Sequence, residues 1–200
     1  MTTLYQTIVI DPPWRYATSL PGFGKRRGDG TWERPGSVVP YPTLTVAEIA
    51  ALPIGNLAAK DAHLYLWTTN HHLPTAFGIA RAWGFTYSTA LVWAKTPRGM
   101  SGQPAWNVCT EFVLFCRRGS LPALTRQGRN WFAWQRGKHS AKPPEFLTMV
   151  EETSPGPRVE VFARVRRPGW DSIGQEIDGR DVRDVLRHLD GVAVAGRETA

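Results

Sequence analysis

The segment Asp11-Pro12-Pro13-Trp14 brings together the residue types that a base amine requires. The exocyclic amine of adenine is a weak nucleophile because its lone pair is delocalised into the ring, and acceptors on its N–H groups pull the nitrogen toward tetrahedral geometry. The carboxylate of Asp11 and the main-chain carbonyl of Pro12 are such acceptors, and neither proline has an N–H that competes with them. The indole of Trp14 offers a face on which a base stacks. The segment therefore suits a site that holds an adenine amine for attack on an electrophilic methyl sulfonium.

A simpler interpretation of the same segment is a turn followed by a core tryptophan. The apolar run Thr7-Ile8-Val9-Ile10 precedes it and predicts a buried strand that ends at Asp11, because proline has no N–H for a ladder. Ligands of open α/β sheets bind at the carboxyl ends of strands. The acid at such a strand end favours the functional interpretation.

Hydrophobic patterns along the chain predict an α/β fold with a mostly parallel sheet and helices on both faces. Thr45 and Glu48 have the spacing of a capping box, which predicts a short helix. A strand at 63–68, a helix from 73 and a strand at 86–93 form a βαβ unit, which implies parallel strands. Further strands are predicted at 110–116 and 158–164, a helix after 145, a polar loop at 169–176 and a terminal helix at 181–189.

Length, charge and cysteine content limit the class of protein. Two hundred residues with 42% hydrophobic content predict one domain, which we place at 1–190, followed by a flexible tail at 191–200. The formal charge of +7 suits a polyanionic partner such as nucleic acid. Cys109 and Cys116 are too few for a disulfide framework and lack the partners of a zinc site, so we expect core thiols and no metal. No apolar run has the length of a membrane span and no signal pattern begins the chain, so we expect a cytoplasmic protein.

Two regions contain basic residues that could contact phosphate groups. The Gly- and Pro-rich stretch 15–42 has the length of a mobile loop and includes Lys25, Arg26 and Arg27. The segment 126–139 alternates basic residues with aromatic ones, a pattern typical of nucleic-acid surfaces. For each region a solvated or packing role without a ligand is an equally good interpretation. The glycines match neither a P-loop nor Gly-x-Gly-x-x-Gly, which argues against a nucleoside triphosphate ligand.

Nine separate pieces of the chain together resemble one known family. They are Ile10-Asp11-Pro12-Pro13-Trp14, Tyr41-Pro42-Thr43, Leu66-Trp67-Thr68-Thr69-Asn70, Trp83-Gly84-Phe85, Val92-Trp93-Ala94-Lys95, Glu111 to Gly119, Ser140-Ala141-Lys142-Pro143, Glu160-Val161-Phe162-Ala163-Arg164 and Gly169-Trp170 to Glu176. They occur in the family's order across nearly the whole chain. On these pieces the chain is similar to the S-adenosylmethionine-dependent adenine-N6 methyltransferases related to the seventy-kilodalton subunit of the messenger-RNA methyltransferase, which include small bacterial and phage members.

The resemblance implies a Rossmann-like methyltransferase fold, circularly permuted so that the catalytic strand comes first and a cofactor strand last. It implies S-adenosyl-L-methionine as the cofactor and Asp11, Pro12, Pro13 and Trp14 as the catalytic residues. The implied cofactor-binding residues are Lys142, Glu160, Arg164, Arg166, Arg167, Gln175 and Glu176, with Lys142 at the methionine carboxylate and Glu160 at the ribose hydroxyls. Arg166 and Arg167 could also be plain surface charges. The implied substrate-binding residues are Tyr16, Asn70, Lys95, Asn107 and Glu111.

The resemblance also implies the reaction, which is methyl transfer to the N6 amine of adenine in nucleic acid, DNA rather than RNA. A stacked base cannot reach the cofactor, so the enzyme would flip the base or act on single strands. Three alternatives stay open: an RNA adenine-N6 methyltransferase, a cytosine-N4 DNA methyltransferase and a non-catalytic nucleic-acid-binding relative. Larger members of the family hold the cofactor adenine with an acidic stretch before the catalytic strand. Only ten residues precede Asp11 here, so that contact must come from elsewhere or be missing.

Overall fold

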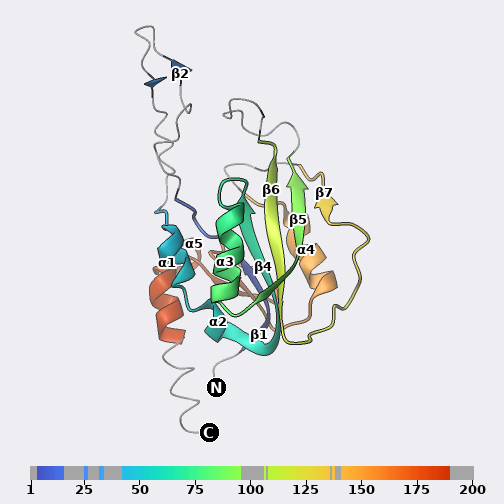
Figure 1. The fold of residues 1–200 in the computed structure, drawn as a ribbon. Coiled ribbons are helices and arrows are strands. Elements are labelled where there is room, and N and C mark those ends of the chain that lie inside the picture. The colour runs from blue at the N-terminus through green and yellow to red at the C-terminus, as the bar shows by residue number, and fades with distance from the viewer. Residues whose placement is uncertain are drawn as a thin grey trace.

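Seven strands form the central sheet: β1 (Tyr5–Ile10), β4 (Ala58–Thr69), β5 (Thr86–Ala94), β6 (Thr110–Arg118), β7 (Trp131–Phe132), β8 (Arg158–Val161) and β9 (Asp171–Ile173). Their order across the sheet is β7-β5-β6-β4-β1-β8-β9 (Figure 1). This computed structural model describes residues 4–15, 42–95, 106, 108–135, 137 and 141–189, and the backbone of the separate hairpin β2 (Lys25–Arg26) and β3 (Trp32–Glu33). The predicted α/β fold with a mostly parallel sheet is confirmed.

Only β6 runs against the other strands of this sheet. It is antiparallel to both β4 and β5, whereas β1 is parallel to β4 and β8, β8 to β9, and β5 to β7. The predicted βαβ unit therefore has two strands of the same direction, but β6 lies between them. As a consequence, the beginning of β6 lies at the same edge of the sheet as the carboxyl ends of β1, β4 and β5.

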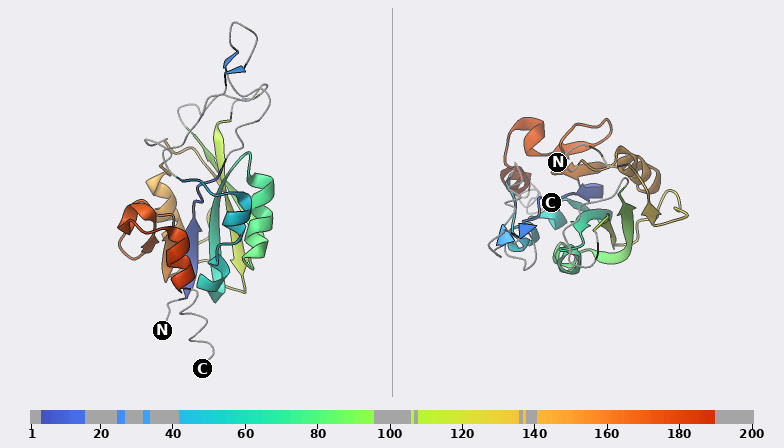
Figure 2. Two further views of the ribbon diagram at one scale, coloured as in Figure 1. Left: turned by 90° about the vertical axis from the view of Figure 1, so that its left-hand side faces the viewer. Right: turned by 90° about the horizontal axis from the view of Figure 1, so that it is seen from above.

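Helices cover both faces of the sheet, as Figure 2 shows with the sheet edge-on. The named helices are α1 (Val46–Ala50), α2 (Ile54–Leu57), α3 (Leu73–Ala82), α4 (Pro144–Thr153) and α5 (Gln175–Asp178), and residues 182–189 are also helical. The first three and the terminal helix share one apolar cluster with Ile8 and Ile10, while α4 packs into a second cluster with Val9. Neighbouring residues of β1 thus enter opposite layers of the core, which is why Ile8, Val9 and Ile10 are apolar in succession.

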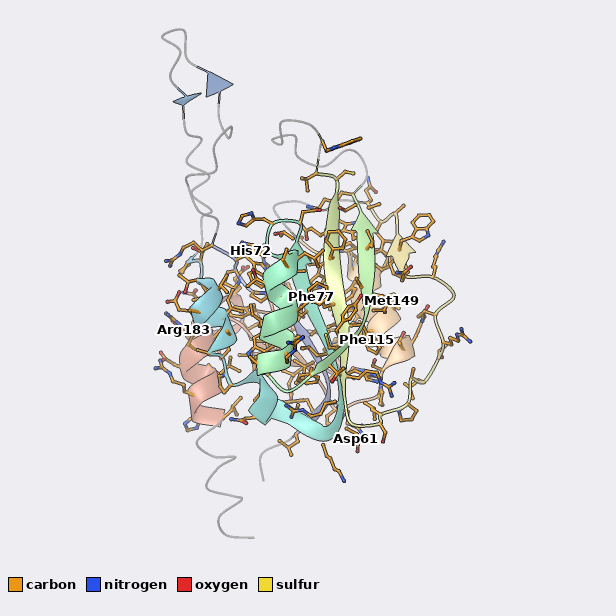
Figure 3. All side chains as sticks on the ribbon, in the orientation of Figure 1. Asp61, His72, Phe77, Phe115, Met149 and Arg183 are labelled. Atoms are coloured by element: carbon orange, nitrogen blue, oxygen red, sulfur yellow. The ribbon has the colours of Figure 1, made fainter. Side chains whose placement is uncertain are left out.

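Local signals account for where several helices begin and end. The Thr45 hydroxyl accepts a hydrogen bond from the Glu48 N–H at 3.2 Å, and the Glu48 carboxylate accepts one from the Thr45 N–H at 2.7 Å, so the predicted capping box is confirmed. Gly84 follows α3 with a φ of +80°, a conformation that glycine adopts without steric cost. Figure 3 labels a residue near each end of β4: His72 follows its carboxyl end, and Asp61 lies near its start.

The end of β8 differs from the prediction. We predicted a strand at 158–164, but β8 stops at Val161 because Phe162 has a φ of +65°, which an extended strand cannot accommodate. The predicted polar loop at 169–176 instead contains β9 and the start of α5. Gly174 makes this arrangement possible, since a Cβ atom there would lie 1.9 Å from the Ala163 carbonyl oxygen.

Three other expectations have mixed outcomes. Cys116 is a core thiol as predicted, but Cys109 is exposed because it lies before the first residue of β6. The side chains of Lys25, Arg26 and Arg27 and the tail at 191–200 lie outside the described residues. Within the described part of the chain, none of the helices is long and apolar enough to cross a membrane.

Candidate active site

Four charged side chains form an alternating chain of ion pairs at the carboxyl edge of the sheet. The Nζ atom of Lys142 lies 2.8 Å from Oδ2 of Asp11 and 3.3 Å from Oε2 of Glu111. The other oxygen of Glu111 accepts a hydrogen bond from Nζ of Lys95 at 2.5 Å. One predicted catalytic residue, one predicted cofactor-binding residue and two predicted substrate-binding residues are thus brought together.

The sheet order explains how these distant residues meet. Asp11 follows β1 and Lys95 follows β5, so both lie at the carboxyl edge of the parallel strands. Glu111 is the second residue of β6 and reaches that edge only because β6 is reversed; its register partners are Thr69 and Trp93. Lys142 lies two residues before α4, where Pro143 and Pro144 fix the backbone at the start of the helix.

Burial and mutual attraction set the charge states of the group. Burial raises the pKa of Asp11, although the nearby ammonium of Lys142 acts in the opposite direction. Burial also opposes the charge of Lys142, but Asp11 and Glu111 outweigh it and raise the pKa of this ammonium. For Glu111, burial is outweighed by Lys142 and Lys95, which lower the pKa of the carboxyl. Lys142 is therefore held as an ammonium between two acids, and its charge also lies 5.0 Å from the centre of the Trp67 ring.

Glu160 lies on β8 beside the catalytic corner. It pairs in register with Val9 of β1 and with Ser172 of β9, which places it on the α4 side of the sheet. Burial raises its pKa to about 7, with a further contribution from the negative charge of Asp11. The hydroxyl of Ser172 is buried without a hydrogen-bond partner in the described part of the chain. A carboxyl and an unsatisfied hydroxyl on adjacent strands fit the vicinal hydroxyls of a ribose, because both can exchange hydrogen bonds with a diol.

Trp14 does not present an open ring face in this structure, which corrects the prediction that it stacks on the base. Its side chain is buried, with 6% of its surface exposed, and its ring stacks on His72 with 4.7 Å between ring centroids. Its indole N–H donates to the carbonyl of Trp67 at 3.1 Å. Because the ring is already covered and hydrogen-bonded, Trp14 fixes the turn after Asp11 from within the core.

The backbone of the two prolines is held on both sides. The Pro12 carbonyl accepts a hydrogen bond from the Trp14 N–H at 2.8 Å, and the Pro13 carbonyl accepts one from the Leu44 N–H at 2.8 Å. A carbonyl oxygen has two lone pairs, so the Pro12 oxygen retains one acceptor position. The corner is therefore rigid, and its acceptor capacity is not exhausted.

Arg167 makes structural contacts in this structure, and its predicted cofactor contact stays a prediction. Its guanidinium binds both oxygens of Glu151 on α4, at 2.7 and 2.8 Å, and donates to the Thr148 hydroxyl at 3.1 Å. The indole N–H of Trp170 donates to the same carboxylate at 2.6 Å. This fork ties the segment after β8 to α4 through Nε and one of the two terminal nitrogens of the guanidinium. Arg166 is exposed on the surface, the alternative that the sequence left open.

The remaining predicted residues differ in position and in contacts. Arg164 lies close enough to Asp11 to lower the pKa of that carboxyl, and it lies 3.6 Å from Glu176. Gln175 and Glu176 are exposed and begin α5. The amide of Asn70 donates to the carbonyl and the hydroxyl of Thr110, at 3.0 and 3.1 Å, and so holds the start of β6. Tyr16 and Asn107 lie outside the described residues.

Sequence reasoning missed two residues of this site. Ser172 falls in the predicted polar loop, because the strand β9 that orients it is only three residues long. Trp67 falls in the predicted strand 63–68, and its place directly before Thr68-Thr69-Asn70 is the signal that could have located it beside the lysine. In the described residues no group of three or more His, Cys, Asp and Glu side chains could hold a metal ion.

The mostly parallel seven-stranded sheet, with an acid at the end of β1 and a half-buried glutamate on β8, defines a Rossmann-like methyltransferase fold. The family model MT-A70 matches residues 5–176, and the chain belongs to the MT-A70 family. The family resemblance inferred from the sequence is thereby confirmed.

Two relatives give the family its context. The chain is 32% identical over 189 residues to the Type II methyltransferase M.MunI of a Mycoplasma species, a match that covers 86% of this chain and 78% of that protein. It is 26% identical over 193 residues to the N(6)-adenosine-methyltransferase MT-A70-like protein of Drosophila melanogaster, a match that covers 90% of this chain and 28% of that protein. The chain therefore belongs among methyltransferases. It spans 78% of the length of the bacterial relative and 28% of the length of the fly protein.

Proposed function

We propose that this protein transfers a methyl group from S-adenosyl-L-methionine to the N6 amine of adenine in nucleic acid, and that the nucleic acid is DNA. The observation that carries the proposal is the position of Asp11 at the end of β1, 2.8 Å from the Lys142 ammonium and close enough to Glu160 for its charge to raise the pKa of that carboxyl. The name of the fly relative specifies an adenosine N6 position, which supports the target atom. The higher identity to a bacterial Type II methyltransferase supports DNA over RNA.

The catalytic role of the corner follows from its acceptors. Lys142 occupies Oδ2 of Asp11, so Oδ1 is the oxygen that accepts from the target amine. The second lone pair of the Pro12 carbonyl accepts from the other N–H of the same amine. Together the two acceptors hold the nitrogen in one orientation, and positioning of this kind supplies much of the rate of a transfer reaction. Pro13 and Trp14 keep both acceptors in place.

The cofactor is assigned to the β1-β8-β9 side of the edge. S-adenosyl-L-methionine supplies the electrophilic methyl group. Glu160 and Ser172 suit its ribose hydroxyls, and Lys142 has a third N–H for its carboxylate after contacting Asp11 and Glu111. Arg164, Gln175 and Glu176 lie on the adjoining segment and complete the candidate set. In this assignment β1 is the catalytic strand and β8 the cofactor strand of a permuted, single domain at 1–190.

The base is assigned to the opposite side of Asp11. Lys95 and Glu111 form the wall there, and Trp93 lies beneath the Lys95 ammonium, 5.4 Å from Nζ to the ring centre. Asn70 supports this wall through Thr110. Tyr16 and Asn107 stay predictions as substrate contacts.

One experiment tests the reaction and its alternatives together. The protein is incubated with S-adenosyl-L-methionine labelled in the methyl group and with separate DNA and RNA pools, and the modified nucleosides are identified after digestion. N6-methyladenine from DNA is the expected product. N6-methyladenine from RNA alone would move the substrate to RNA, N4-methylcytosine would replace the target base, and the absence of labelled product from both pools would favour a non-catalytic binding protein.

A further inference from the structure

Acidic and basic residues are unevenly divided along the sequence. Residues 62–144 contain ten lysines and arginines and a single acid, Glu111, which is a formal charge of +9. The other residues carry 14 basic and 16 acidic side chains, a formal charge of −2. The basic stretch includes most of β4, all of α3, β5, β6 and β7, and its one acid is already paired with Lys95 and Lys142. The whole formal surplus of positive charge therefore comes from the segment 62–144.

The outermost strand of that segment exposes a tryptophan. Trp131 in β7 is 54% exposed, whereas its neighbour Phe132 is 7% exposed and stacks on Trp134 with 4.3 Å between ring centroids. Because side chains of a strand alternate, Trp131 points away from this buried stack. The exposed indole is thus carried by a strand that is anchored in the core.

The backbone beside Trp131 is also fixed. The Asn130 carbonyl accepts a hydrogen bond from the Val92 N–H at 2.8 Å, and the Asn130 amide donates to the Ala90 carbonyl at 3.0 Å. β7 pairs only with β5 in the described sheet, so its outer edge is open. An exposed aromatic ring on a rigid edge strand costs little conformational entropy to use for binding.

Arginines accompany this ring. The guanidinium carbon of Arg129 lies 5.9 Å from the ring centres of both Trp131 and Phe132. Residues 122–131 are all exposed and include Arg126 and Arg129 but no acid. Exposed aromatic rings for base stacking, combined with arginines for the backbone, are typical of surfaces that bind single-stranded nucleic acid.

The strand geometry places this surface beside the base side of the site but not on it. Trp131 is the register partner of Val92, which lies three residues before Lys95, about 10 Å along a strand. Four strand spacings separate β7 from β1, about 19 Å across the sheet. Trp131 therefore cannot contact a base held at Asp11, but it can contact another nucleotide of the same strand.

We infer that the β7 edge, defined by Arg126, Arg129 and Trp131, binds the nucleic-acid strand that flanks the target nucleotide. One unpaired base stacks on Trp131, and the two arginines contact neighbouring phosphates. This inference rests on the proposed function, because it names a second contact of the same substrate. It also separates the two interpretations of the segment 126–139, a nucleic-acid surface and a packing role. In this inference Trp131 binds the nucleic acid, while Phe132 and Trp134 pack in the core.

The test measures equilibrium binding of a fluorescent single-stranded oligonucleotide of about 20 nucleotides, by anisotropy, at several salt concentrations. Trp131→Ala is expected to weaken binding about 5- to 100-fold with the salt slope unchanged, because it removes a stacking contact. Trp131→Phe is expected to recover part of the loss. Arg129→Gln is expected to reduce the slope of log affinity against log salt by about 0.7, the value for one phosphate contact on a single strand.

Two controls match these variants. Arg183→Gln removes an arginine on the side of the molecule opposite β7, as the label of Arg183 in Figure 3 and that of β7 in Figure 1 show. This variant should leave the affinity and the salt slope unchanged. Leu124→Ala removes an exposed apolar side chain that follows the end of β6 and should have no effect. Thermal unfolding of every variant confirms that the fold is retained.

Specific results would overturn the inference. If Trp131→Ala and Arg129→Gln both keep the wild-type affinity and salt slope, the β7 edge does not bind the nucleic acid. A change of oligomeric state in Trp131→Ala with unchanged oligonucleotide affinity would make this edge a contact between copies of the chain. Failure of the proposed function is distinguishable, because the binding assay needs no methyl transfer: an oligonucleotide bound through Trp131 but never methylated would retain the surface and reject the reaction.

Discussion

The ammonium of Lys142 lies 2.8 Å from Oδ2 of Asp11, so the acid assigned to the target amine is already neutralised on one side. The pairing has two consequences. It lowers the pKa of Asp11 and so opposes part of the increase that burial causes, and it leaves one carboxylate oxygen for the substrate. The same lysine contacts Glu111, so the catalytic corner and the base wall are electrostatically connected.

Replacement of the acid tests the catalytic assignment. Asp11→Asn keeps the shape of the side chain but offers an N–H where an acceptor is needed, and we expect kcat to fall about 1,000-fold, as for loss of one oriented polar group in other active sites. Cofactor affinity, measured by calorimetry, should change less than that. Turnover near the wild-type value would contradict the role of Asp11, and a circular dichroism spectrum like that of the wild type excludes misfolding as the cause of a loss.

Glu111 is expected to be a stabilising residue as well as part of the base wall. Glu111→Gln leaves Lys95 and Lys142 beside a neutral amide, and we expect the free energy of unfolding to fall by about 2 kcal/mol, since breaking a mostly buried ion pair leaves uncompensated charge. Urea unfolding measures this change. Adding Lys95→Met should recover part of the loss. The matched control is Glu176→Gln, which breaks an exposed pair and should cost less than about 0.5 kcal/mol.

The raised pKa of Glu160 predicts a pH dependence of stability. Its pKa is about 7 in the folded protein and near 4.5 when exposed, so the folded state holds this proton more tightly. The protonated Glu160 side chain therefore contributes its full stability to the fold below pH 4.5, and this contribution is lost as the pH rises through 7. Glu160→Gln removes the penalty, and we expect it to stabilise the protein by about 2–3 kcal/mol at pH 8 and to have little effect at pH 4.5.

The measurement for Glu160 is urea unfolding of the variant and the wild type at both pH values. Using the difference between the two proteins cancels the titration of other groups. Glu145→Gln, at an exposed position of the first turn of α4, serves as the control and should show no such difference. An equal effect of Glu160→Gln at pH 4.5 and pH 8 would contradict the prediction.

Arg167 should affect stability and not cofactor binding. A double-mutant cycle of Arg167→Gln with Glu151→Gln is expected to give a coupling energy of about 1 kcal/mol, because the two-point contact is good but partly exposed to solvent. Cofactor affinity, measured by calorimetry, should stay within about twofold of the wild-type value for Arg167→Gln. A loss of cofactor affinity much larger than this would restore the role that the family resemblance implies.

The sequence predicted the parts of this protein that depend on local physics. The apolar run before Asp11 identified β1, the Thr45 and Glu48 spacing identified α1, and periodicity identified α3. Strand ends set by backbone conformation were harder to predict. The positive φ of Phe162 stops β8 early, although no residue type at this position indicates it.

For the site, the sequence alone determined which residue types were available and that Asp11 ends a strand, because proline imposes this locally. Only the tertiary structure decided which of them meet. Reversal of β6 brings Glu111 to Lys142, burial assigns Trp14 to the core, and Glu151 on α4 engages Arg167. Contacts between residues far apart in the chain depend on strand order and on competing partners, and the local sequence determines neither of them.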